Sequence, residues 1–342
     1  MSKTFLISDI HFNLKNASKE WLDIQKDYFN NFFIPQLNKG DSIIILGDLF
    51  DNRSTINILV LNEVLTIFKT LSEICQEIRC LPGNHDQYNK TDYGINSLIV
   101  LQDFKNIFVH NKPELINLNN QDFLLVPFFE NKLEEKEFLK KFQSGTTIAC
   151  MHTEINGFFY TKNIKVDNKN EASVYSKYKH VYSGHYHINQ TQKNITYIGS
   201  PYQMDRNDIG NQKFLYYIEN GVEQVLINDY SPEFKRIDID ENNLSEDFSE
   251  VVNNNFVDFY FTQEVSTKIN VYDFIKCFTG ARNINIFIKD SEEKLEVVYN
   301  QSDKFSIIEL SKKYLELVKN IDEKDRLKIL GYLENKYKLL NI

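Results

Sequence analysis

Hydrophobic and polar positions in the first 230 residues alternate between short strand-like runs and longer helical stretches. Short apolar runs rich in β-branched residues predict strands at 4–8, 42–46, 78–81, 123–126, 146–151, 180–183 and 195–198. Apolar residues at helical spacing predict one helix from Trp21 to Phe32, limited by Pro35, and a second from Ile56 to Ile74. This alternation is typical of an α/β domain in which helices flank the sheet.

The pattern changes near residue 230. Between 231 and 302 the chain has seven basic and fourteen acidic residues, with strand-like segments at 257–261 and 284–288, so we expect a small separate α+β domain. From 303 to 342 apolar residues recur every three or four positions, which predicts a helical hairpin with two apolar stripes. The hairpin either packs on its own domain or binds helices of a partner. Its position beyond a domain that already looks complete favours the partner.

Composition excludes several classes of protein. The chain has 342 residues, 42% of them hydrophobic, and no apolar run of the roughly 18 residues that a membrane span needs. We therefore expect neither a transmembrane protein nor a secretory precursor. The four cysteines show no C-x-x-C spacing, which is typical of reduced thiols in the cytoplasm. A net charge of -9 makes tight, unaided nucleic-acid binding improbable, because phosphate binding depends on Lys and Arg.

Residues suited to metal chemistry gather where five of the predicted strands end. The clusters are Asp9-Ile10-His11, Gly47-Asp48-Leu49-Phe50-Asp51, Gly83-Asn84-His85-Asp86, His152 and Gly184-His185-Tyr186-His187. In open α/β sheets such strand ends meet at one edge, where functional sites assemble. Five of the seven histidines lie in these clusters.

The clusters predict a metal site with mixed oxygen and nitrogen ligands. Seven side chains qualify as ligands: Asp9, His11, Asp48, Asn84, His152, His185 and His187. A carboxylate can bridge two cations, so sharing Asp48 provides four protein ligands for each of two metals. That number leaves room for water and a substrate oxygen, as a catalytic site requires.

The motifs occur in an order that resembles a known family. The series D-x-H, G-D-x-x-D, G-N-H-D, a lone His and G-H-x-H is similar to that of the calcineurin-like metallophosphoesterases. The turn Ile198-Gly199-Ser200-Pro201, the extra domain and the terminal hairpin resemble its DNA double-strand-break-repair nuclease branch, which includes SbcD-like proteins and phage recombination endonuclease subunits. The motifs span about 1–205. The resemblance implies an α/β (α+β) sandwich of two sheets flanked by helices, with a small α+β capping domain and a C-terminal helical hairpin.

The resemblance also implies roles for individual residues. Asp9, His11, Asp48 and His187 would hold one metal, and Asp48, Asn84, His152 and His185 the other. His85 corresponds to a catalytic histidine near the scissile phosphate that binds no metal, and Asp86 is expected to orient it. Asp51 is expected to support the site rather than to bind metal. Manganese is the usual cation, although magnesium, iron and zinc also suit these ligands.

The function implied is a manganese-dependent DNA endonuclease or exonuclease subunit for recombination and double-strand-break repair. In this interpretation 1–230 is the nuclease core, 231–302 positions DNA, and 303–342 binds an SbcC-like coiled-coil ATPase, since the chain has no P-loop motif. We also expect a homodimer in the bacterial cytoplasm, or in the host cytoplasm if a phage encodes it. The alternatives are a phosphoprotein phosphatase or cyclic-nucleotide phosphodiesterase on the same scaffold, and a catalytically inactive scaffold, which the complete ligand set disfavours.

Several other residues are expected to have only packing or surface roles. We expect His110 and His180 to serve packing or surface roles, and Cys150 to be a buried apolar side chain. The aromatic runs Phe128-Phe129 and Phe158-Phe159-Tyr160 could stack on unpaired bases. Because the chain has 26 phenylalanines, core packing is favoured for each of them. The segment from Lys132 to Lys141 mixes both charges and predicts a solvated helix.

Overall fold

The computed structural model describes residues 2–89, 93–142, 145–162, 164–289 and 328–331. The chain divides into two compact units, Met1–Lys235 and Arg236–Ile342. None of the helices in the described part is long and apolar enough to cross a membrane.

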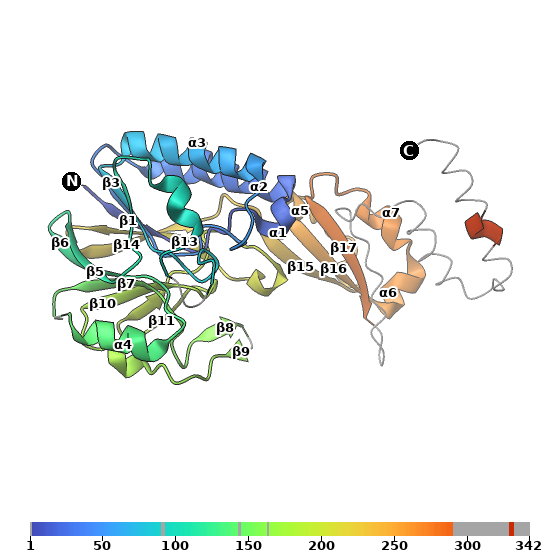
Figure 1. Cartoon of the computed structure of the whole chain (residues 1–342). Helices are drawn as coiled ribbons and strands as arrows, with labels where there is room; N and C mark the ends of the chain where they lie inside the picture. The colour runs from blue at the N-terminus through green and yellow to red at the C-terminus, as the bar shows by residue number, and fades with distance from the viewer. Residues whose placement is uncertain (1, 90–92, 143–144, 163, 290–327, 332–342) are drawn as a thin grey trace. The chain divides into compact units, whose positions relative to one another are not determined.

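The first unit contains two six-stranded sheets (Figure 1). One has the order β14-β13-β1-β2-β3-β4, with bounds Val222–Asn228, Lys213–Glu219, Thr4–Ile7, Ser42–Ile45, Glu77–Cys80 and Ile107–Val109. The other has the order β11-β12-β10-β7-β6-β5, with bounds Gln190–Gln192, Ile195–Tyr197, His180–Gly184, Ile148–His152, Gln121–Val126 and Glu114–Leu118. Each sheet has four neighbouring parallel strands, β1 to β4 in one and β12, β10, β7 and β6 in the other. Their carboxyl ends therefore lie along one edge of each sheet.

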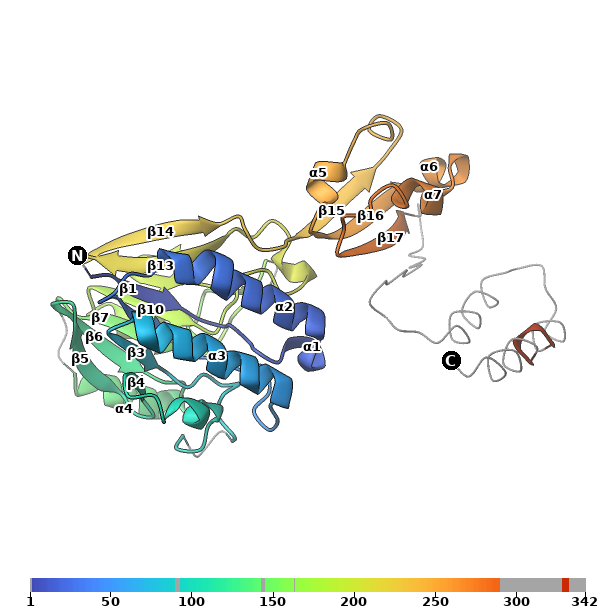
Figure 2. The same cartoon turned by 90° about the horizontal axis from the view of Figure 1, so that it is seen from above.

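Helices cover the first sheet on its outer face. Figures 1 and 2 show α2 (Lys19–Asp27) and α3 (Ile58–Ile74) side by side over it, with the short turn α1 (Leu14–Ala17) before α2. The chain after α2 continues in helical turns through Tyr28–Phe33 and Ile34–Gln36, and Pro35 lies in the last of them. Both predicted helices of this region are confirmed. Helix α3 begins at Asn57, whose side chain accepts a hydrogen bond from the Leu59 amide.

The second sheet has its own apolar outer layer. Helix α4 (Lys132–Lys140) buries Leu139 against Ala149 and Met151 of β7. A separate two-stranded hairpin, β8 (Phe159–Thr161) and β9 (Ile164–Lys165), follows β7 in the chain. The remaining helical turns are short: Ser97–Leu101, Ala172–Tyr175 and Arg206–Asp208.

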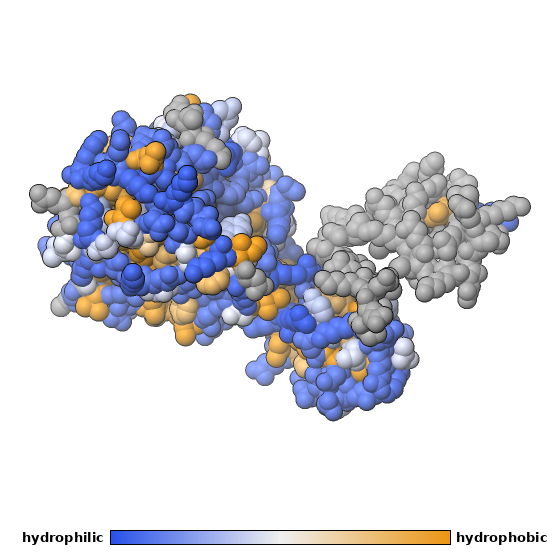
Figure 3. All heavy atoms as spheres, turned by 90° about the horizontal axis from the view of Figure 1, so that it is seen from below, coloured by the Kyte–Doolittle hydropathy of each residue, from blue (hydrophilic) through white to orange (hydrophobic). Residues whose placement is uncertain are grey.

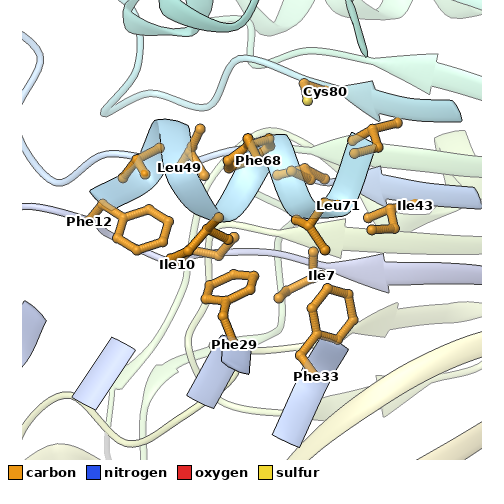
Figure 4. Packing of buried hydrophobic residues seen from close by; sticks show 14 of the residues in the cluster. Ile7, Ile10, Phe12, Phe29, Phe33, Ile43, Leu49, Phe68, Leu71 and Cys80 are labelled. Atoms are coloured by element: carbon orange, nitrogen blue, oxygen red, sulfur yellow. The ribbon is translucent and has the colours of Figure 1, made fainter. Parts of the chain in front are cut away.

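Strands β1, β2 and β7 are buried throughout, which explains why their sequences are continuous apolar runs without alternation. In β1, Phe5 and Ile7 pack in the layer that α2 and α3 cover, whereas Leu6 packs between the two sheets. Figure 4 shows Ile7 among the aromatic side chains Phe29, Phe33 and Phe68. The unit is thus a sandwich of two sheets flanked by helices, and the predicted fold class is confirmed. Its surface in Figure 3 is mainly hydrophilic, with apolar side chains in scattered groups.

The second unit is α+β. Its three-stranded sheet, β15-β16-β17, has bounds Phe234–Ile239, Phe256–Thr262 and Asn283–Lys289, and the helices are α5 (Ser249–Val252), α6 (Gln263–Lys268) and α7 (Val271–Ile275). Phe259, Phe261 and Ile286 lie in its apolar core. The proposed boundaries and roles of 231–302 and 303–342 stay predictions. The terminal hairpin lies outside the described residues, apart from a helical turn at 328–331.

All nine predicted strands are present, with ends shifted by two residues or fewer. Eight described strands were not predicted: β4, β5, β8, β9, β11, β13, β14 and β15. Most of them are edge strands or members of hairpins, where half-exposed positions replace the continuous apolar run.

Candidate metal centre

The loops that follow β1 and β2 hold each other through their backbones. The Asp9 amide donates to the Gly47 carbonyl at 3.1 Å, and the His11 amide donates to the Asp48 carbonyl at 3.1 Å. Asp9, His11 and Asp48 all have positive φ, between 51° and 52°. For residues with a Cβ this conformation costs on the order of 1 kcal/mol each, so the surrounding fold must impose it.

Two motif glycines allow the loops to approach closely. A Cβ on Gly83 would collide with Oδ1 and the backbone nitrogen of Asp48, and a Cβ on Gly184 would collide with Oγ of Ser8. Glycine is therefore required at both positions by packing against neighbouring strand ends. These close contacts explain why glycine is the first residue of the G-N-H-D and G-H-x-H motifs.

One group of metal-binding atoms comes from Asp9, His11 and His187. A ligand atom from each lies within 4.8 Å of the others. The Nε2 atoms of His11 and His187 are 3.2 Å apart, and His187 Nε2 lies 4.0 Å from Asp9 Oδ1. The Asp9 carboxylate is fully buried and accepts the His185 amide at 3.0 and 3.1 Å, which holds it in place.

A second group comes from Asp48, His152 and His185, again within 4.8 Å of one another. Asn84 completes it, because its Oδ1 lies 3.0 Å from His152 Nε2 and 2.7 Å from His185 Nδ1. The Nδ1 of His152 faces the Leu46 carbonyl at 2.6 Å. A carbonyl can only accept, so Nδ1 carries the proton and Nε2 is the nitrogen free for a cation.

Asp48 lies between the two groups. Its Oδ2 is 3.4 Å from His152 Nε2 and 3.8 Å from His11 Nε2, and its Oδ1 accepts the His85 amide at 2.8 Å. Ligands about 2.1 Å from a shared cation lie about 3 Å from each other, so these spacings fit divalent ions on both sides of Asp48. All seven predicted ligands are thus brought together.

The charges of the cluster depend on one another. Burial opposes ionisation of Asp48, but His152 and His11 outweigh it and hold the pKa of Asp48 below its usual range. Burial lowers the pKa of His152, but Asp48 more than compensates and raises it to about 9. Without cations, a proton on His152 therefore offsets part of the charge of Asp48.

His85 lies beside the cluster, and its catalytic role stays a prediction. One of its ligand atoms is within 4.8 Å of His11 and Asp48, and its ring centroid is 4.9 Å from that of His11. Its Nδ1 faces the Asp51 carbonyl at 2.7 Å. Nε2 is therefore the ring nitrogen that this carbonyl does not contact. The Asp51 carboxylate lies 3.2 Å from His11 Nδ1, a supporting position consistent with its expected role.

The prediction that Asp86 orients His85 is wrong. The Asp86 carboxylate is fully buried and accepts the amides of Leu49 (3.2 Å), Phe50 (3.1 Å) and Gly83 (2.9 Å). It thus fastens the loop after β2 to the loop after β3. The carbonyl of Asp51, on the other loop, holds the His85 ring instead. Burial and the charge of Asp48 raise the pKa of Asp86 to about 6.

Glu154 is a site residue that the sequence analysis missed. Its Oε1 lies 3.1 Å from Nε2 of His185, whose Nδ1 faces Asn84 in the second donor group. A carboxylate at this distance favours the tautomer with the proton on Nε2, which leaves Nδ1 available to a cation. Glu154 is two residues after His152, and this spacing was the available signal.

Lys213 was also missed. It is buried and forms an ion pair with Asp208 at 2.6 Å, and its Nζ donates to the His187 carbonyl and to Ser200 Oγ, both at 2.8 Å. The Ser200 amide donates to the same carbonyl at 3.2 Å. The Gly199-Ser200-Pro201 turn therefore fixes the backbone of His187 from behind.

A cavity of about 110 Å³ opens beside the second donor group. It is lined by Arg53, Asn84, Gln87, Asn89, Phe128, Glu130, Glu154 and His185. Phe128 stacks on the His185 ring at 5.8 Å and is almost completely buried. The cavity provides space for a substrate group next to the predicted ligands Asn84 and His185.

Of the residues expected to have only packing or surface roles, Phe128 lies at the site, on the His185 ring. His110 contacts Glu114, His180 contacts Thr196, and Cys150 is buried between the sheets. Phe128, Phe129 and Phe158 are buried, as expected. The expectation of core packing is wrong for Phe159 and Tyr160, which follow Phe158 and are 39% and 57% exposed.

Comparisons with known proteins point to one family. A family model described as calcineurin-like phosphoesterase matches residues 2–189, which contain every residue of the cluster. Exonuclease subunit 1 of Enterobacteria phage T4 is 28% identical over 227 residues, 65% of this chain and 66% of that protein, so the match spans just under two thirds of its length. A solved structure described as a novel archaeal phosphodiesterase is 10% identical and covers 66% of this chain and 99% of its own. Its TM-score of 0.33 is too low to establish a shared fold.

Proposed function

The chain belongs to the calcineurin-like phosphoesterase family, and from this premise we propose that it is a two-metal phosphodiesterase that cleaves DNA. The predicted family resemblance is confirmed, and with it the prediction of a phosphoester hydrolase at the level of the family. The similarity to a phage protein named as an exonuclease subunit supports DNA as the substrate. The position of Asp48 between two donor groups is the observation that carries the proposal.

We assign the donor atoms to two cations. Asp9, His11, Asp48 and His187 would hold one, and Asp48, Asn84, His152 and His185 the other. When bound, two divalent cations lower the pKa of a water and neutralise charge that develops on a phosphodiester. Manganese suits this mixture of carboxylate, amide and imidazole, and magnesium is a second candidate.

The side chains of the cluster have separate tasks in this proposal. The His187 side chain is 38% exposed and His185 lines the cavity, so the entering phosphate would reach the cluster at these two ligands. His85 binds no cation; the Asp51 carbonyl holds its Nδ1 proton, so Nε2 is free to carry a proton to the leaving oxygen. Phe128 closes the side of the His185 ring and excludes water from it.

The test is degradation of linear DNA by the purified chain with Mn²⁺, beside EDTA and His85→Ala. We expect cleavage that EDTA abolishes and that His85→Ala slows by about 10²–10⁴, the usual contribution of a general acid or base. Metal analysis should still find two ions per chain in His85→Ala. His180→Ala, a histidine outside the cluster, is the matched control and should cleave normally.

Each contrary result has its own meaning. If His85→Ala loses its metals, the role given to His85 is wrong. If the chain hydrolyses bis(p-nitrophenyl) phosphate but no DNA, the two-metal site stands and the DNA assignment fails. In that case a phosphoprotein or a cyclic nucleotide becomes the substrate to test.

We further propose that the chain works as a homodimeric nuclease subunit with an SbcC-like coiled-coil ATPase in recombination and double-strand-break repair. The phage relative is itself named as a subunit, and this chain contains no P-loop motif. The predicted hairpin at 303–342 would bind the partner. Removal of 303–342 should then abolish co-purification with the ATPase and leave bis(p-nitrophenyl) phosphate hydrolysis unchanged. Retained binding would contradict the assignment.

A further inference from the structure

The β8–β9 hairpin exposes aromatic side chains that core packing does not use. Phe158, just before it, is fully buried, whereas Phe159 is 39% and Tyr160 is 57% exposed. Ile164 on the second strand is also 57% exposed. Single exposed apolar residues are ordinary, but three within six residues leave this short hairpin with several apolar side chains in contact with solvent.

The hairpin is anchored to the strand that follows the metal centre. The Gln190 side chain accepts from the Phe159 amide at 2.8 Å and donates to the Phe159 carbonyl at 2.6 Å. Gln192 adds a bond to the Gly157 carbonyl at 3.0 Å. Gln190 opens β11, three residues after His187, so these bonds hold the hairpin in place beside the proposed ligands.

Tyr160 is the exposed end of a row of rings that reaches the cluster. Its ring centroid lies 6.2 Å from that of Tyr186, at 84°. The Tyr186 ring, which is almost completely buried, lies 5.1 Å from the ring of His185. Phe159 is not part of this row; Lys165 Nζ lies 5.9 Å from its ring.

We propose that Tyr160 stacks on an unpaired base of the DNA strand whose phosphodiester lies at the metal centre. The inference rests on the proposed function and adds a recognition site to it. Stacking on aromatic rings tolerates any base and is worth about 1–3 kcal/mol per base by alanine substitution. Lys162 and Lys165 place positive charge on the same hairpin, in a chain whose net charge is -9.

The experiment compares Tyr160→Ala, Tyr160→Phe and Phe159→Ala on a single-stranded oligonucleotide and on bis(p-nitrophenyl) phosphate. Tyr160→Ala should raise KM for the oligonucleotide about 5- to 150-fold, which is 1–3 kcal/mol converted at 1.4 kcal/mol per tenfold. Tyr160→Phe keeps the ring, and Phe159 lies outside the row of rings that reaches His185, so both variants should behave as the wild type. The small diester has no base, and its kcat/KM should stay the same in every variant.

A binding measurement separates this inference from the proposed function. In the His85→Ala background, which keeps the DNA intact, an oligonucleotide carrying 2-aminopurine should lose fluorescence on binding, and Tyr160→Ala should prevent that loss. If the wild type cleaves DNA but Tyr160→Ala matches it on the oligonucleotide, the stacking inference is overturned and the nuclease stands. If no DNA is cleaved, the proposed function fails, while quenching through Tyr160 still reports on stacking. Equal losses on both substrates would mean a structural defect and would overturn the inference.

Discussion

Glu154 provides the sharpest test of how the second donor group is prepared for a cation. Its carboxylate lies 3.1 Å from His185 Nε2, and the other nitrogen of that ring faces Asn84 Oδ1 at 2.7 Å. The proton held on Nε2 leaves the Nδ1 lone pair for the metal. Glu154→Ala removes both this orientation and the negative charge behind the ring, so the affinity for one of the two cations should fall.

The size of the effect follows from charge and exposure. The His185 ring is neutral when its Nδ1 holds a cation, so Glu154 acts through the hydrogen bond at Nε2 and through its charge on the cation beyond the ring. The Glu154 side chain is 43% exposed, so solvent screens that charge. We therefore expect about a tenfold weaker Kd, the lower end of the roughly 10- to 100-fold known for such supporting groups. Glu154→Gln still accepts a hydrogen bond and should lose about threefold, within the range of a neutral hydrogen bond.

The assay is isothermal titration of the metal-free chain with Mn²⁺, resolved into two binding events. Only one event should weaken in Glu154→Ala, and Glu137→Ala, which removes an exposed carboxylate from α4, is the matched control. Unchanged binding of both ions would refute the role of Glu154. Equal weakening of both would show that the change disturbs Asp48 or the fold rather than one histidine.

Three further predictions concern the frame around the site. Gly83→Ala places a Cβ against Asp48 Oδ1 and should abolish binding of both metals, measured by metal analysis after dialysis. Lys213→Met leaves the buried Asp208 unpaired and should cost about 3–5 kcal/mol in urea unfolding, partly restored by also changing Asp208 to Leu. Burial lowers the pKa of His110 below its usual 6.5, so protonation favours the unfolded chain. Its contribution to stability is complete above about pH 6.5 and is lost as the pH falls, so His110→Gln should flatten the decline of Tm below pH 6.5.

The fold of the first unit was predictable where strands are buried on both faces. Runs such as Ile43-Ile44-Ile45 admit few other readings in an α/β context. The sequence analysis missed the hairpin of β13 and β14. It was predictable, because Asn220-Gly221, with φ of 54° and 72°, is a strong signal for a two-residue turn. Asn119-Asn120, between β5 and β6, is a similar turn.

The candidate site was predictable to the extent that parallel strands align their ends. Asp9, Asp48 and Asn84 come together because β1, β2 and β3 are neighbours in register. The orientation of single side chains was less accessible. The Asp86 carboxylate faces backbone amides of the loop after β2 rather than His85, and this loop is distant in sequence. Tyr160 is exposed although Phe158, two residues earlier, is buried.

Strain and charge together link this site to the stability of the fold. Asp9 and Asp48 are buried carboxylic side chains, and both have positive φ, so the unit holds them in place at a cost in free energy. Backbone amides and a protonated His152 offset part of that cost when no cation is bound. A divalent ion that binds only the folded chain adds RT ln(1 + [M]/Kd), about 2.7 kcal/mol at a hundredfold excess over Kd. Asp9 and Asp48 are both strained residues and proposed ligands, so a bound cation would stabilise these strained loops directly.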